Sequence, residues 1–115
     1  MKTLIAVLAL CALAYSHDCQ KRTQITQNDI NNVDSVTYVT VTRDAGRFYF
    51  LQYDRYFDVP HQAPNQYQTY GTIRSQGCKL NVDTEYILGC KSDKSYCFAR
   101  PVSQLTADEK SLLKW

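Results

Sequence analysis

The stretch that decides the fold is CKLNVDTEYILGCKSDKSYCF, residues 78–98, and it reads as a β-hairpin. Residues 86–88 are a short apolar run that favours a strand, residues 92–95 are typical of a turn, and residues 95–98 form the returning strand. With the turn centred on Asp93 and Lys94, Cys90 and Cys97 face each other on antiparallel strands. Facing positions lie close enough for a disulfide. We expect the rest of the chain to pack around this hairpin.

The first 16 residues have the pattern of a secretory signal peptide. Lys2 precedes an unbroken apolar run over residues 4–13, and small residues follow at Ala14 and Ser16. The run is too short to span a bilayer. Cleavage after Ser16 and cleavage after Ala14 both fit, and either predicts a protein secreted outside the cell. Because Lys2 is the only charge lost, the net charge falls from +2 to +1.

Four cysteines remain after Cys11 leaves with the leader: Cys19, Cys78, Cys90 and Cys97. An even number in a secreted chain predicts two disulfides, and four cysteines allow three pairings. Neither histidine lies near the cysteines in a metal-binding spacing, so no metal site is expected. A single domain of about a hundred residues is expected over positions 17–115, and a domain of this size can build a core but gains stability from disulfides.

The remaining elements are predicted as strands followed by one helix. Residues 36–42 are β-branched or aromatic at every position, residues 47–59 form a long aromatic strand, and residues 66–74 form a third strand with a bulge at Gly71. Residues 17–32 are polar and are expected to form an extended arm without a helix. Thr106 and Glu109 make a capping box that opens a C-terminal helix, with Leu112 and Trp115 on its packing face.

Several short strands and a terminal helix on a stapled chain predict a mainly β protein, a small β-barrel with an α-helix packed on it. Tyrosines at 49, 53, 56, 67 and 70 offer one possible exposed aromatic patch, since tyrosine favours binding surfaces.

These features resemble the netrin-like module of tissue inhibitors of metalloproteinases. The resemblance is carried by Cys78 with the EYILG run at 85–89, by Cys97-Phe98, and by the stretch from Pro101 to Leu112. It implies an OB-like five-stranded β-barrel with a C-terminal helix. The length is similar to that of short, single-domain netrin-like excretory-secretory proteins of parasitic nematodes.

The resemblance also implies a protease-contact ridge. In the inhibitor family, the α-amine and carbonyl of an N-terminal cysteine chelate the protease zinc, and the next residue enters the specificity pocket. Carried over, these are Cys19 and Gln20, with Lys21 following. The second half of the ridge is Ser75, Gln76 and Gly77, just before Cys78. The family pairing implies a Cys19–Cys78 disulfide, which leaves Cys90 for Cys97.

Three departures from the inhibitor pattern stand out. Lys21 replaces the second cysteine of the family's C-x-C motif. The family's long loop after the first strand is only the turn at residues 43–46. His17 and Asp18 precede Cys19, so its amine is an internal amide, which has no free lone pair for zinc.

No spacing of nucleophile and base, paired carboxylates or phosphate-binding loop indicates an enzyme or a cofactor. The near-zero charge gives no reason to expect nucleic acid or a membrane as partner. Two interpretations remain. One is an inhibitor of an extracellular metalloprotease in which the N-terminal part of the contact ridge, the wedge that enters the protease site, is altered. The other is a non-inhibitory secreted module that binds a host or other extracellular protein.

Overall fold

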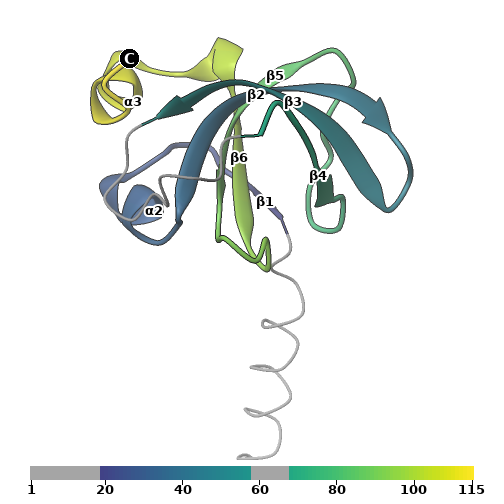
Figure 1. The fold of residues 1–115 in the computed structure, drawn as a ribbon. Helices are drawn as coiled ribbons and strands as arrows, with labels where there is room; N and C mark the ends of the chain where they lie inside the picture. Colours follow the sequence, from purple (N-terminus) through teal and green to yellow (C-terminus); the bar gives the residue numbers. More distant parts are fainter. Residues whose placement is uncertain (1–18, 58–67) are drawn as a thin grey trace, which may run out of the picture.

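The computed structural model describes residues 19–57 and 68–115, which form one six-stranded sheet with short helices at one end (Figure 1). The strand order is β1-β6-β5-β2-β3-β4. The strands are β1 (Gln20–Lys21), β2 (Ser35–Asp44), β3 (Phe48–Phe57), β4 (Tyr70–Arg74), β5 (Glu85–Cys90) and β6 (Cys97–Pro101). The expected signal peptide at residues 1–16, and also His17, Asp18 and His61, lie outside the described residues. Among the described residues, no helix has the length and apolar character needed to cross a membrane.

The β5–β6 hairpin forms as the sequence predicts. Cys90 lies opposite Cys97 in the register, and the two form a disulfide. The turn is closed by a backbone hydrogen bond from Lys91 N to Tyr96 O of 2.9 Å, and Lys94 takes a positive φ of 58°. Five of the six residues of β5 are buried because β5 lies in the middle of the sheet, between β6 and β2. The hairpin is therefore the centre of the fold.

The long β2–β3 pairing contains the irregularities of the sheet. Its register shifts between Tyr38 and Val39 and again between Val41 and Arg43. The predicted bulge at Gly71 is wrong, because β4 pairs with β3 without a shift. Gly71 instead makes room for the Tyr53 ring: a Cβ at this position would lie 2.7 Å from a Tyr53 ring carbon.

The mainly β architecture with a C-terminal helix is confirmed, but the sheet is not a closed five-stranded barrel. It has six strands, and the short β1 joins β6 in parallel at one edge while β4 is the other edge. A side chain reaches across near the β4 edge: Lys94, from the β5–β6 turn, donates a hydrogen bond through Nζ to the carbonyl of Thr72 (3.1 Å). A single lysine thus links β4 to this turn without a strand ladder.

The N-terminal arm contains a helix that we did not expect. After β1, residues Gln27–Asn31 form α2, with Thr26 as N-cap. The Thr26 hydroxyl accepts from the backbone of Asp29, and the Asp29 carboxylate accepts from Thr26 N (2.8 Å). This is a capping box with Asp in place of the usual Glu, so the prediction of an extended arm is wrong.

The C-terminal helix α3 (Ala107–Leu112) follows a short 3-10 turn, η1 (Val102–Gln104), and has the predicted Thr106–Glu109 capping box. Its packing face differs from the expected one. Leu113 is the residue buried in the core, and Leu112 is only partly buried. Trp115 remains 45% exposed and stacks on Phe57, with ring centroids 5.8 Å apart.

The most buried polar contact in the core joins β6 to α3. Glu109 is 0% exposed and receives Arg100 Nη2 at 2.9 Å and Arg100 Nε at 3.0 Å. Its two oxygens also accept from the backbone N–H groups of Ile25 (2.9 Å) and Thr106 (3.1 Å). Burial by itself raises the pKa of Glu109, but the hydrogen bonds from Arg100, Ile25 and Thr106 outweigh it and lower the pKa to about 2.

We predict that this carboxylate makes stability depend on acid. The pKa of Glu109 falls from 4.5 to about 2 on folding, so its contribution is present above pH 4.5 and is lost as the pH falls toward 2. The contribution is about 3 kcal/mol. Urea unfolding between pH 6 and pH 2 should show that the free energy of unfolding of the natural chain falls steeply with pH. The free energy of unfolding of Glu109→Gln should depend less on pH. Asp108→Asn, an exposed neighbour on α3, is the matched control. Equal pH profiles for the natural chain and Glu109→Gln would contradict this role.

We also predict that removing residues 106–115 destabilises the sheet by more than about 3 kcal/mol, because it leaves the buried Arg100 without its ion pair. The midpoint of urea unfolding measures the loss. If the shortened chain does not fold, Leu113→Ala tests the same packing with an expected cost of about 2–4 kcal/mol. An unchanged midpoint in both variants would show that α3 is not part of the core.

Candidate functional site

The two segments proposed as a contact ridge lie side by side. Cys19 and Cys78 form a disulfide, with Cα atoms 5.3 Å apart, and both side chains are buried. The pairing agrees with the one implied by the resemblance. It places Gln20 and Lys21 beside the segment formed by Ser75, Gln76 and Gly77.

Gly77 sets how closely the two segments approach. It has a φ of +91°, and a Cβ built on it would lie 2.2 Å from the carbonyl oxygen of Cys19. Both the positive φ and the contact with backbone require glycine here. The carbonyl of Cys19, the group that would face zinc in the inhibitor family, is therefore packed against Gly77.

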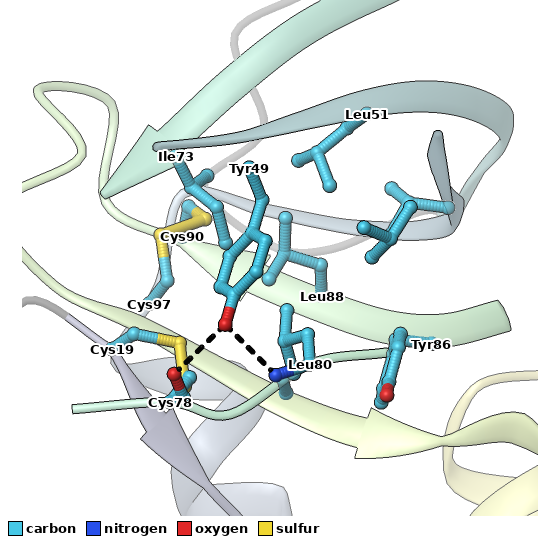
Figure 2. Close-up of a cluster of buried hydrophobic side chains, with 13 residues drawn as sticks. Cys19, Tyr49, Leu51, Ile73, Cys78, Leu80, Tyr86, Leu88, Cys90 and Cys97 are labelled. Carbon is cyan, nitrogen blue, oxygen red and sulfur yellow. Dashed lines mark hydrogen bonds between the residues drawn. A yellow bond between two sulfur atoms is a disulfide. The ribbon is translucent and has the colours of Figure 1, made fainter. Parts of the chain in front are cut away.

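The second segment is held by backbone carbonyls and one side chain of the β2–β3 hairpin. Ser75 donates through its hydroxyl to Gly46 O (2.6 Å), and its backbone N–H bonds to Arg47 O (2.9 Å). Figure 2 shows the Tyr49 hydroxyl between two backbone groups: it donates to Cys78 O (3.2 Å) and accepts from Leu80 N (3.1 Å). The segment around Cys78 is thus fixed from two sides.

Gln20 and Lys21 belong to a strand and do not form a projecting wedge. Their backbones pair in parallel with Phe98 and Ala99 of β6. The Gln20 side chain is half-buried and accepts a long hydrogen bond from the Tyr96 hydroxyl (3.4 Å). Lys21 is exposed. The protease-contact role of these residues is not tested by this geometry and stays a prediction.

A small hollow lies beside the β5–β6 hairpin. It is lined by Thr37, Tyr53, Tyr56, Lys94 and neighbouring residues. Burial, and then the nearby Tyr56, raise the pKa of Tyr53 to about 12, and burial lowers the pKa of Lys94. Within the described ranges, no group of His, Cys, Asp or Glu residues could hold a metal ion.

The aromatic surface lies on different residues from those the sequence singled out. Tyr49 points into the core at 5% exposure, Tyr53 and Tyr56 are half-buried, and Tyr67 lies outside the described residues. Tyr70 is exposed (68%), and its exposed aromatic neighbours in β3 are Phe48 (43%) and Phe50 (40%). Because side chains alternate along a strand, residues 48 and 50 lie on the face opposite Tyr49 and Leu51. Applying this alternation to the sequence of β3 would have separated the two sets of residues.

Comparison with known proteins identifies relatives of the chain. The family model of excretory-secretory protein 2 (AceES-2) matches residues 17–114. The crystal structure of excretory-secretory protein 2 from Ancylostoma ceylanicum is similar, with 43% sequence identity, a TM-score of 0.80, and coverage of 87% of this chain and 96% of that chain. No curated protein sequence matches the chain. Since the family model spans nearly all of the described residues and the identity is well above what a shared fold alone requires, the chain belongs to the excretory-secretory protein 2 family.

Proposed function

We propose that this protein is a secreted, non-catalytic module that binds an extracellular protein, without inhibiting metalloproteases in the manner of the tissue inhibitors. The family and the two disulfides support secretion, since such bonds persist in oxidising compartments. Sequence spacing offers no catalytic constellation.

The observation that carries the proposal is the state of Cys19. Chelation in the inhibitor family uses a free α-amine and an accessible carbonyl on the same cysteine. Here the carbonyl oxygen lies against Gly77. The family match begins at residue 17, so the matched region includes two residues before Cys19, and these make its nitrogen an amide. An amide nitrogen without a free lone pair does not bind zinc.

The other departures act in the same direction but more weakly. Lys21 stands where the inhibitors have a second cysteine, and the connection after β2 comprises only residues 45–47. These changes reduce the contact area, while the extension before Cys19 removes a metal ligand. We therefore expect the missing chelating group to be the main reason for a lack of inhibition.

We predict that a chain shown by mass spectrometry to begin at His17 does not inhibit a panel of matrix metalloproteases below micromolar concentration. A chain trimmed to begin at Cys19 should gain at most weak inhibition, because Cys19 remains packed against Gly77. Progress curves with a fluorogenic peptide substrate measure both chains. Nanomolar inhibition by the chain that begins at His17 would overturn the proposal.

The binding half of the proposal has its own test. The natural chain should bind at least one member of a panel of immobilised extracellular proteins saturably. A reduced and alkylated chain, which lacks both disulfides, is the control and should lose the interaction. Saturable binding to none of the panel would count against an interaction module.

A further inference from the structure

The outer face of the β2–β3–β4 sheet combines exposed aromatic rings with arginines. In the register, Phe48 lies opposite Arg74, while Phe50 lies between Arg43 and Thr72. Among the five large hydrophobic residues that are exposed in the described part of the chain, three lie on β3 and β4: Phe48, Phe50 and Tyr70. Aromatic residues and arginine are the types enriched at protein interfaces, so this clustering favours a binding surface over scattered exposure.

The arginines on this face retain their binding capacity. Arg43 lies over the Phe50 ring, with its guanidinium carbon 5.6 Å from the ring centroid. Among the described residues, no side-chain hydrogen bond or ion pair involves the guanidinium groups of Arg43, Arg47 or Arg74. A guanidinium presents five N–H donors in a planar fork that matches a carboxylate. The acidic neighbour Asp44 is engaged in the hairpin turn, where its carboxylate accepts from Gly46 N (2.9 Å).

A hollow connects this face to the ridge. It is lined by Arg47, Phe48 and Arg74 together with Gly46, Ser75 and Gln76. Two cations around one hollow repel each other, and an anionic partner group relieves that repulsion. The adjoining Phe48 ring offers apolar contact to the same partner. In Figure 1, β4 and the tip of the β2–β3 hairpin lie at the opposite end of the sheet from α2 and α3.

We propose that this face, defined by Arg43, Arg47, Phe48, Phe50, Tyr70 and Arg74, binds an acidic, partly apolar segment of an extracellular protein. Carboxylates of the partner pair with Arg47 and Arg74, and apolar side chains of the partner cover Phe48 and Phe50. The inference rests on the proposed function, because it names the surface through which the secreted module makes its contact.

The charge pattern argues against two other occupants. A two-fold contact with a second copy would bring the arginines of one face against the same arginines of the other, where like charges are unfavourable. A sulfated polysaccharide would satisfy the arginines but would leave Phe48, Phe50 and Tyr70 without an apolar partner. An acidic protein segment with apolar residues satisfies both parts of the surface.

The test uses three labelled 12-residue peptides, composed of Glu and Leu, of Glu and Ser, or of Lys and Leu, and the intact disulfide-bonded protein. Fluorescence polarisation at 150 mM salt should show the Glu/Leu peptide binding at least tenfold more tightly than the other two. The double variant Arg47→Glu/Arg74→Glu should lose at least tenfold in affinity. Lys91→Glu/Lys114→Glu, which makes the same charge change at exposed sites elsewhere, should remain within twofold of the natural chain.

A second variant separates the apolar contribution from charge. Phe48→Ser/Phe50→Ser should weaken the Glu/Leu peptide at least fivefold and leave the weak binding of the Glu/Ser peptide unchanged. Circular dichroism and the urea midpoint establish that each variant is folded. Equal binding of all three peptides, or equal loss in both charge-reversal variants, would overturn the proposal.

The alternative occupants give distinct outcomes. Tighter binding of heparin than of the Glu/Leu peptide, abolished by Arg47→Glu/Arg74→Glu, would assign the face to polysaccharide and overturn the proposal. Concentration-dependent dimerisation in sedimentation, abolished by the same variant, would assign it to a second copy and would also overturn it. If the natural chain and this variant bind an extracellular protein equally well, this face is wrong while the proposed function stands. If neither binds any protein of the panel, the proposed function fails as well.

Discussion

The fold depends on one buried carboxylate. Glu109 brings together three parts of the chain: α3, on which it lies, β6 through Arg100, and the N-terminal arm through the backbone N–H of Ile25. An ion pair removed from water is favourable only where further hydrogen bonds complete it, and Glu109 has four. Because losing the contact with Arg100 or with Ile25 would leave a buried donor without its partner, the arm and the helix stabilise each other's position.

This contact positions the N-terminal ridge as well as the helix. Between Cys19 and Ile25, the arm is held by its disulfide at one end and by Glu109 at the other. Between these points, β1 and Arg22 bond to β6, and Arg22 also forms an ion pair with Asp29 of α2 (2.9 Å). A segment fixed at so many points has little freedom to reorient toward a protease, which agrees with a ridge that serves the core.

The sequence was sufficient to predict the elements with strong local signals. The β-branched run at 36–42, the β5–β6 hairpin and the Thr106 capping box are all found in the structure, since period, turn residues and caps act over a few neighbours. The α2 helix is not predicted from the sequence, although Thr26 and Asp29 have capping-box spacing, because an Asp replaces the usual Glu and the surrounding sequence is polar. The open sheet could not be predicted, since strand order depends on pairings between residues far apart in the chain.

The disulfides of the site could be predicted from the sequence, but its exposed surface could not. The Cys90–Cys97 disulfide is predictable because the two residues face each other in the hairpin register, which is a local rule. The Arg100–Glu109 pair is not predictable in this way, because one residue lies in a strand and the other in a capping box. Exposed aromatic residues were misjudged for a related reason. Tyrosine and phenylalanine both favour strands, so residue type does not separate them. Alternation along β3 puts residues 48 and 50 on one face and Tyr49 on the other, and the bonds from the Tyr49 hydroxyl to Cys78 and Leu80 show which face is the inner one.

The same hydroxyl explains why the outer face can be rich in exposed aromatic groups without loosening the sheet. Tyr49 buries its ring and satisfies two backbone groups of the segment that follows β4, so β3 is anchored from its inner face. The Lys94 contact with Thr72 restrains β4 near its free edge. With the inner face, the disulfides and the buried ion pair carrying stability, residues 48, 50, 70 and 74 contribute little to the core. Their apolar and charged groups are available for recognition, and substitutions there should alter binding before they alter folding.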